Sequence, residues 1–446
     1  MKILLISPCR DLRLKTPRGA MMPQLSLHIL KGLTPEEYEV KIIEEEIRDV
    51  NFDEECDLVG LSCMTSNAPR AYYIASEFKK RGKAVVIGGV HPTIIPHEAA
   101  LHADAVAIGE AENLWEDILI DFKAGRLKKY YQKGPPDLKK YIPMKNRSGK
   151  RRLFNILPIM TTRGCPYTCE FCCVSDIYEK QIRHVPIENI VRSIEESEGR
   201  NFMFLDDNII GNPGYAKELF TAIKPLNIKW VGQASISFVN DAGIMKLASE
   251  SGCRGLFFGV ESVSETQLKR MKKSLKEIKN IEDAVKKVKD LGIIFHASLI
   301  FGFDDDTESI FPETLKFLNK TKMSSASFNI LTPYPGTKIY EQFKREGRLL
   351  TENWQYYDHS TCVFRPKHMT PYELQRGKIW VKKEFSKMHN IMRRLPGNIS
   401  HPIVYLALNY SINRIIKTDI KELEWQVEEI YGPADGMPSK EKKLKY

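Results

Sequence analysis

The chain contains two series of short apolar segments, and a polar stretch separates them. In the first series, segments rich in Val, Ile and Leu lie at 2–7, 38–45, 58–64, 84–90 and 105–110. Helical patterns fill the intervals between them, for example 69–81, which Gly82 follows. Short apolar strands that alternate with helices are typical of a parallel sheet covered on both faces. The pattern predicts a doubly wound, Rossmann-like domain over residues 1–126.

The second series predicts a barrel. Its strands are expected at 157–162, 202–207, 229–235, 255–262, 293–303 and 325–333. Helices are expected between them, including 239–251 and 275–291, each of which ends before a glycine. Six strand–helix units in a row predict an open, partial (β/α)6 barrel over 157–345, smaller than the closed eight-unit form. The fold class is therefore α/β.

Two further regions lack sustained strand signals. Residues 127–156 contain Pro-Pro, Gly and many charges without a period, which predicts a linker. After 345 the chain predicts a mainly helical accessory domain over 346–446, with helices at 371–394 and 401–417. Thr370 and Pro371 are a helix-start signal, with Thr as N-cap and Pro at the first helical position.

The composition is that of an ordinary globular protein, with 42% hydrophobic and 28% charged residues and no apolar run long enough to span a membrane. The apolar run at 2–7 is too short for a signal peptide, so we interpret it as a strand. We expect a cytoplasmic, reducing environment. There, clustered cysteines indicate metal or redox chemistry rather than disulfides.

The formal net charge of +10 is compatible with nucleic acid, an acidic substrate, an anionic surface or a lysine-rich solvated surface. Part of the excess lies in the C-terminal region, where residues 371–417 contain nine Lys or Arg against Glu373 and Glu384, with Asp419 just beyond. Basic amphipathic helices there could lie on a membrane or could pack on the barrel with their lysines in water. Both interpretations stay open.

The most specific motif is "TTRGCPYTCEFCC" at 161–173. Cys165, Cys169 and Cys172 form a C-x3-C-x2-C pattern in the loop after the first barrel strand. A zinc site usually has four ligands, and no second cysteine pair matches this one, so a zinc knuckle is the weaker alternative. Three thiolates suit a [4Fe-4S] cluster whose fourth iron can bind an exogenous molecule. Cys173 is expected to pack beside the loop rather than to act as a ligand.

This motif, with an aromatic residue before the third cysteine, resembles the cluster motif of radical S-adenosylmethionine (SAM) enzymes. The resemblance covers about 157–345 and implies that the open iron binds SAM, whose reductive cleavage gives a 5′-deoxyadenosyl radical. The SAM contacts that it implies are Phe171, Asp206, Asp207, Gln233, Glu261, Ser262, Ser298, Phe301 and Gly302. The stretch "LDDN" stands where the family often has a Gly-Gly-Glu-like stretch, so the role of the two aspartates stays open. Each polar residue could instead be an N-cap or a strand-end residue.

The order of the domains resembles the branch of radical SAM enzymes in which a cobalamin-binding domain precedes the barrel. The stretches "SCMTSN" and "GGVHPT" resemble the loops around the nucleotide tail of cobalamin, and a G-x-G-x-x-G dinucleotide motif is missing after the first strand. The cobalamin contacts that the resemblance implies are Ser62, Met64, Thr65, Gly88, Gly89, Val90, His91, Gly109 and Glu110. The loop after the first strand contains no histidine, so cobalt would lack an imidazole from that loop, and His91 is expected to contact the tail instead. The alternative is a domain that has lost its cofactor and caps the barrel.

The resemblance implies a cobalamin-dependent radical SAM methyltransferase that acts on an unactivated carbon through the 5′-deoxyadenosyl radical and methylcobalamin. Its substrate would be a lipid, a peptide or protein, or a natural product. Its partners would be SAM and a reductant of flavodoxin or ferredoxin type, with no nucleic acid and with membrane contact through the basic C-terminal helices. Two alternatives stay open. One is a cyclase or C–C coupling enzyme without net methyl transfer, and the other is a nucleic-acid- or membrane-surface-binding protein with a structural cluster.

Overall fold

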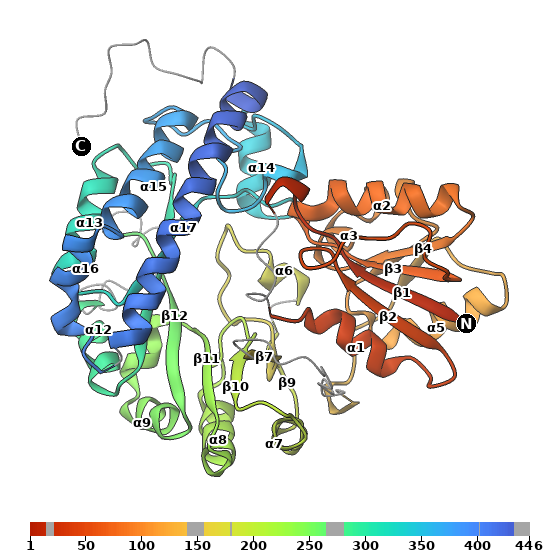
Figure 1. Cartoon of the computed structure of the whole chain (residues 1–446), viewed down its shortest axis with the longest axis horizontal. Helices are drawn as coiled ribbons and strands as arrows, with labels where there is room; N and C mark the ends of the chain where they lie inside the picture. The colour runs from red at the N-terminus through yellow and green to blue at the C-terminus, as the bar shows by residue number, and fades with distance from the viewer. Residues whose placement is uncertain (15–21, 141–155, 179–180, 265–280, 401, 432–446) are drawn as a thin grey trace.

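The computed structural model describes residues 1–14, 22–140, 156–178, 181–264, 281–400 and 402–431. Two six-stranded parallel sheets organise these residues, one in the N-terminal third and one in the middle of the chain. A group of helices formed by the C-terminal residues lies against the second sheet (Figure 1).

The N-terminal sheet has the strand order β2-β1-β3-β4-β5-β6. Its strands are β1 (Lys2–Ser7), β2 (Glu39–Glu44), β3 (Leu58–Ser62), β4 (Ala84–Gly88), β5 (Ala105–Ile108) and β6 (Tyr130–Gln132). Helices α1 (Leu25–Leu33) and α5 (Trp115–Lys123) pack on one face, and α2 (Ala68–Lys80) and α4 (Pro96–His102) pack on the other. The short α3 (Val90–Ile94) follows β4. The predicted doubly wound domain is confirmed.

One strand of this sheet lies in the segment predicted as a linker. Residues Tyr130–Gln132 pair in parallel with β5 and add β6 to the edge of the sheet. Only Tyr131 of the three is buried, and its hydroxyl donates to Asp121 at 3.0 Å. A strand with one buried residue carries no periodic signal, which explains why the sequence pattern did not show it.

The second sheet forms the predicted partial (β/α)6 barrel, which is confirmed. Its strands run in chain order across the sheet, as β7, β10, β11, β12, β13 and β14. They are Ile156–Ile159, Asn201–Phe204, Lys229–Ala234, Cys253–Glu261, Ile294–Phe301 and Ser325–Ile330. The helices after them are α7 (Ile187–Glu195), α8 (Pro213–Ile223), α9 (Ala242–Glu250), α12 (Ile281–Asp290), α13 (Ile310–Lys320) and α14 (Lys338–Arg345).

The C-terminal helices are α15 (Pro371–Phe385), α16 (Met388–Arg394) and α17 (Pro402–Gln426), followed by a π-helical turn (Val427–Tyr431). The predicted start of α15 is confirmed, because the Thr370 hydroxyl accepts from the Glu373 N–H at 3.2 Å and the Glu373 carboxylate accepts from the Thr370 N–H at 2.8 Å. The helix predicted over 371–394 is two helices that break at Ser386. The second predicted helix continues nine residues past Lys417, since Leu423 and Gln426 find buried positions.

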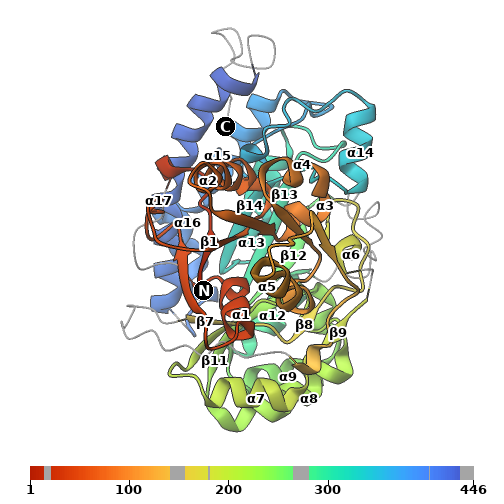
Figure 2. The ribbon, with the colours of Figure 1, turned by 90° about the vertical axis from the view of Figure 1, so that its right-hand side faces the viewer.

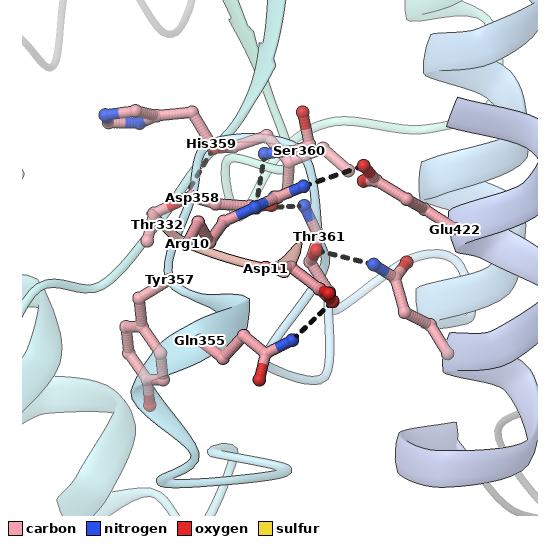
Figure 3. A network of polar contacts seen from close by, with 12 residues as sticks. Arg10, Asp11, Thr332, Gln355, Tyr357, Asp358, His359, Ser360, Thr361 and Glu422 are labelled. Atoms are coloured by element: carbon pink, nitrogen blue, oxygen red, sulfur yellow. Dashed lines mark hydrogen bonds and ion pairs between the residues drawn. The ribbon is translucent and has the colours of Figure 1, made fainter. Parts of the chain in front are cut away.

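The N-terminal domain lies in front of the barrel in the view of Figure 2 and also contacts the C-terminal helices. In the loop after β1, Arg10 forms ion pairs with Asp358 and with Glu422 of α17, the latter at 2.7 Å (Figure 3). Asp11 accepts from the Gln355 side-chain amide at 2.8 Å. The loop that could approach a ligand at the end of β1 is therefore held by the C-terminal region.

The packing of α15 on α13 generates a stability prediction. A Cβ on Gly377 would lie 2.1 Å from the Phe311 ring, although alanine is the better helix former. We expect Gly377→Ala to lower the free energy of unfolding by about 1–3 kcal/mol, because Phe311 is buried and has no space into which to move. Denaturant unfolding measures the change.

The matched control is Gly214→Ala in α8, where the nearest atom to the new Cβ is the Asn212 side-chain oxygen at 3.4 Å. This variant should stay within about 0.5 kcal/mol of the parent chain. Equal stability of the two variants would contradict the packing described for α15.

Candidate functional site

The cysteine motif lies in the long connection of a small antiparallel ribbon. Its strands are β8 (Thr162–Arg163) and β9 (Arg183–His184), with Thr162 opposite His184 and Arg163 opposite Arg183. Gly164 opens the connection with φ +93°, and a Cβ there would lie 2.0 Å from the Gln181 carbonyl oxygen. The two ends of the cysteine loop therefore meet closely, and only glycine fits where they meet.

The three predicted cluster ligands are neighbours on this loop, and each is partly exposed. Burial and the nearby Cys173, Cys169 and Asp207 raise the pKa of Cys172 to about 12, and burial also raises the pKa of Cys165. Among the residues that the structure describes, no three His, Cys, Asp or Glu side chains are gathered as closely as a bound metal ion requires. The donor set itself fits an iron–sulfur cluster, since three soft thiol sulfurs occupy one accessible loop.

Asp206, one of the two aspartates whose role the sequence left open, is held inside the fold. It is fully buried, and its carboxylate accepts from the Thr161 hydroxyl and the Thr162 hydroxyl at 2.6 Å each and from the backbone N–H groups of both residues. Burial raises its pKa and these donors oppose that rise. Asp206 ties the end of β10 to the start of the cysteine loop, which is a structural role.

Asp207, the next residue, is the carboxylate that lies beside the thiols. It accepts from the Gly164 N–H at 3.2 Å, and its charge contributes to the raised pKa values of Cys165, Cys172 and Cys173. Burial raises the pKa of Asp207 itself to about 6. Of the two adjacent aspartates, this one is available to a ligand at the loop.

The strands of the barrel alternate between buried residues and partly exposed residues that face its interior. Gln233, Glu261 and Ser298 belong to the exposed set. Glu261 has φ +67°, and the strand register shifts between Gly259 and Glu261, so a bulge turns this carboxylate at the end of β12. Ser298 accepts from the Asn329 side-chain amide at 3.3 Å.

Four other predicted SAM contacts take part in the protein's own packing. Ser262 is buried and accepts from the Ser264 N–H at 3.1 Å. The Phe301 ring is buried against Phe311 and Phe328, and the Phe171 ring packs edge-on against Phe303 at 6.3 Å between centroids. The Gly302 N–H donates to Asp306 at 2.8 Å, and the space beside its Cα is taken by Leu374. The side chain of Phe301 therefore faces away from the barrel interior.

The sequence reasoning missed His296 on β13, which belongs to the same inward row as Ser298. Its ring lies 4.5 Å from the Phe257 ring, and its Nε2 is buried without a hydrogen-bond partner among the described residues. Burial lowers the pKa of His296 to about 4. The signal for it was a histidine two positions before Ser298 in the otherwise apolar stretch "IIFHASLIF".

The carboxyl ends of the N-terminal strands border a cavity of about 360 Å³. Of the predicted cobalamin contacts, it is lined by Ser62, Gly88, Gly89, Val90, Gly109 and Glu110. Gly60, Ser26 and Thr93 also line it on the N-terminal side, together with aliphatic residues of α1 and the strands. The Thr93 hydroxyl links the two glycine loops by donating to Gly89 O and accepting from Gly109 N–H. A narrow, glycine-rich and largely aliphatic cavity at the end of a parallel sheet fits the tail of a large cofactor.

Three predicted contacts, Met64, Thr65 and His91, do not line this cavity. His91 is fully buried, with Nε2 3.4 Å from Glu98, whose carboxylate also accepts from the indole N–H of Trp354 at 2.9 Å. The prediction that His91 contacts the cobalamin tail is therefore not supported by its position. It packs between the N-terminal sheet and the C-terminal region.

The cysteine loop and the cavity share a wall. Arg163, Ile177 and Tyr178 of the ribbon and loop line the cavity opposite the glycines. Arg163 is 4% exposed and forms ion pairs with Glu110 and Glu112, which follow β5. Arg183, its partner across the ribbon, also pairs with Glu110. We call these four residues the arginine–glutamate bridge.

The turn after β13 generates a pH prediction. Asp306 accepts from the N–H groups of Gly302 and Phe303, yet burial raises its pKa to about 6. The folded chain therefore holds a proton that the unfolded chain releases between about pH 4 and 6, so this group makes the fold less stable as pH rises through that range. In Asp306→Asn the side chain is neutral at every pH, so the thermal midpoint of this variant should fall less steeply between about pH 4 and 6 than that of the parent chain.

The raised pKa of Asp207 also makes the fold less stable as pH rises. The slope of the thermal midpoint against pH should therefore be smaller in Asp306→Asn than in the parent chain, but not zero. The control is Glu195→Gln, an exposed residue at the end of α7, which should leave the slope unchanged. A wild-type slope in the Asp306 variant would show that this carboxyl is ionised throughout the range.

Two family models match the chain. The Radical SAM superfamily model matches residues 159–318, and the B12 binding domain model matches residues 16–119. The first match runs from the end of β7 through β13 and includes the cysteine loop, and the second covers the strands that border the glycine-rich cavity.

Curated relatives match almost the whole chain. Bacteriochlorophyllide d C-12(1)-methyltransferase of Chlorobaculum tepidum is 31% identical over 93% of this chain and 93% of its own length. Bacteriochlorophyllide d C-8(2)-methyltransferase of the same organism is also 31% identical, over 90% of this chain and 93% of its own. Hopanoid C-2 methylase of Rhodopseudomonas palustris is 23% identical over a smaller part, 75% of this chain and 67% of its own.

Solved structures share the fold at low identity. The radical SAM methyltransferase TsrM from Kitasatospora setae, with cobalamin and a [4Fe-4S] cluster bound, is 16% identical with a TM-score of 0.65 over 84% of each chain. The cobalamin-dependent enzyme OxsB, with aqua-cobalamin and SAM bound, is 15% identical with a TM-score of 0.66 over 96% of this chain and 81% of its own. With its cysteine loop set against a B12-type cavity and relatives matched along nearly its full length, the chain belongs to the cobalamin-binding branch of the radical SAM superfamily, together with the bacteriochlorophyllide methyltransferases.

Proposed function

We propose that this enzyme is a cobalamin-dependent radical SAM methyltransferase that methylates an unactivated carbon of a lipophilic ring compound. One observation carries the proposal: residues of the cysteine loop form one wall of the cavity whose other wall is the glycine-rich edge of the N-terminal sheet. A methyl carrier in that cavity and a radical source at the loop would then be adjacent.

Cys165, Cys169 and Cys172 would hold the cluster, and Ser62, Gly88, Gly89 and Gly109 would border the cobalamin tail. When bound, the cluster supplies the electron that cleaves SAM, and cobalamin carries the methyl group. The aliphatic lining of the cavity would keep water from these reactive groups.

Within the barrel, Asp207 is the carboxylate that we assign to the charged amino end of SAM, because it lies at the loop and its neighbour Asp206 is fully engaged. Gln233, Glu261 and Ser298 face the interior and would meet the rest of SAM. His296 precedes Ser298 in this row and would be neutral. Its Nε2, which has no hydrogen-bond partner among the described residues, would form a hydrogen bond with a polar group of the ligand.

The substrate class is proposed from the relatives. Two of them act on bacteriochlorophyllide d and one on a hopanoid, which are large apolar ring systems. Inward-facing Phe257 and Ile300 give the barrel interior an apolar character that suits such a compound. We also propose a reductant of flavodoxin or ferredoxin type and a cytoplasmic, reducing location, which agrees with the nine free cysteines.

The cluster assignment predicts a sharp difference between neighbouring cysteines. After anaerobic reconstitution with iron, sulfide and hydroxocobalamin, Cys165→Ala, Cys169→Ala and Cys172→Ala should lose the cluster absorbance and form no 5′-deoxyadenosine with dithionite and SAM. Cys173→Ala, the matched control, should keep both signals because its thiol lies outside the triplet. Deoxyadenosine from any of the first three variants would refute the assignment.

The same reconstituted enzyme tests the reaction. With methyl-labelled SAM and bacteriochlorophyllide or hopanoid substrates, the label should appear on a product carbon. A product without label, formed with release of deoxyadenosine, would instead indicate cyclisation or C–C coupling.

A further inference from the structure

An unusual number of large apolar side chains are exposed near the start of the last long helix. Six exposed large apolar residues lie within 388–410, from α16 to the third turn of α17. We call this set the apolar ridge, and it consists of Met388, Met392, Ile399, Ile403, Leu406 and Tyr410. Ile399 and Ile403 are 72% and 81% exposed, while Tyr405 and Asn409 on the opposite side of α17 are buried. Ile403, Leu406 and Tyr410 are therefore on the solvent side of α17, while Met388 and Met392 are on α16 and Ile399 is in the connection between the two helices.

A basic cleft adjoins the ridge. It has a volume of about 560 Å³ and is lined by Lys286 and Lys289 of α12, Lys320 and Lys322 at the end of α13, and Ile399 itself. The acids on its rim are Glu282, which pairs with Lys320 at 2.6 Å, and Asp290. Four lysines against two acids leave the cleft positive, and the ridge residue Ile399 forms part of its wall.

The sequence placed the basic surface on the C-terminal helices, and the structure changes that assignment. Lys378 and Arg394 are buried, and Lys382 and Lys387 pair with Asp419 and Glu384 at 2.6 Å each. Four of the nine basic residues of 371–417 are therefore buried or paired with a carboxylate. The lysines that flank the exposed apolar side chains come from the barrel helices α12 and α13 instead.

The position of this surface separates it from the active site. Pro396–Ser400 and Tyr405 pack beside Gly292–Ile294 and Ser324, which precede β13 and β14. These are the amino ends of the barrel strands, whereas the cysteine loop follows a strand at the carboxyl end. The surface can therefore bind a partner without covering the proposed site.

We propose that the apolar ridge and the lysine cleft together dock the enzyme on the surface of an anionic lipid membrane. Aliphatic side chains that insert between lipid headgroups, beside lysines that meet their phosphates, are the two signals that stable peripheral binding requires. Within the described ranges no helix is long and apolar enough to cross a membrane. The docking does not depend on the proposed reaction, although a lipophilic substrate would reside in the same membrane.

Charge argues against the other occupants. In a symmetric dimer through this surface, the lysine cleft of one copy would lie against the same cleft of the other, and like charges would repel. Single-stranded nucleic acid is bound by aromatic stacking platforms, and Tyr410 is the one aromatic residue of the ridge.

Vesicle binding of the full-length holoenzyme tests the proposal. The chain should co-sediment with vesicles of phosphatidylcholine mixed with phosphatidylglycerol, bind weakly to phosphatidylcholine alone, and dissociate as salt is added. Lys286→Gln with Lys322→Gln should weaken binding about fivefold per lysine. Ile399→Ser with Ile403→Ser should weaken it about tenfold or more.

The matched control is Leu101→Ser on α4, a residue that is 79% exposed and far from the ridge in the chain. It should bind like the parent chain. Absence of wild-type binding to anionic vesicles would overturn the proposal, as would equal binding by the ridge variant and the control. A wild-type dimer that the ridge variant dissociates would overturn it in favour of a second copy. None of these measurements uses turnover, so they stand apart from the proposed reaction.

Discussion

The arginine–glutamate bridge is the interaction on which the arrangement of the two cofactor sites depends. Arg163 and Arg183 face each other across the β8–β9 ribbon, and the whole cysteine loop lies between them in the chain. Both reach the glutamates that follow β5, at the edge of the glycine-rich cavity. A guanidinium as buried as that of Arg163 is stable only when it is paired with a carboxylate. The ribbon is therefore favoured in the one position against the N-terminal domain in which Arg163 reaches its glutamates. The bridge thus sets where the thiols lie relative to the cavity.

The C-terminal region holds the N-terminal domain from another side. Arg10 in the loop after β1 pairs with Asp358 and Glu422, and Glu98 of α4 accepts from the Trp354 indole. The first of these contacts is the network in Figure 3. The N-terminal domain is therefore fixed by polar contacts both to the cysteine ribbon and to the region after the barrel.

Much of the fold could be predicted from the sequence because strands and helices leave local periodic signals. The strand predicted at 2–7 is β1 with the same bounds, and all six barrel strands lie where apolar runs predicted them. The three-residue β6 was missed because one buried residue makes no period. The break of the helix predicted over 371–394 was missed because it depends on tertiary packing rather than on a Pro or Gly.

Only those site residues whose spacing in the chain forms a motif could be predicted from the sequence. The cysteine triplet and most of the glycine-rich cavity follow from local motifs. The direction of a side chain does not, so Asp206 and His91 were placed at ligands although both side chains make contacts within the fold. His296 was hidden in an apolar strand. Arg163 was quoted with the cysteines and not singled out, because its partners lie more than fifty residues earlier in the chain.

The central claim is that the bridge sets the separation of the two cofactors, and a pulsed electron paramagnetic resonance distance between the reduced cluster and cob(II)alamin tests it directly. The parent enzyme should give one narrow distance distribution. Glu110→Gln with Glu112→Gln should broaden or shift it while iron and cobalamin contents stay the same, and the exposed control Glu116→Gln should not. An unchanged distribution in the double variant would contradict the account.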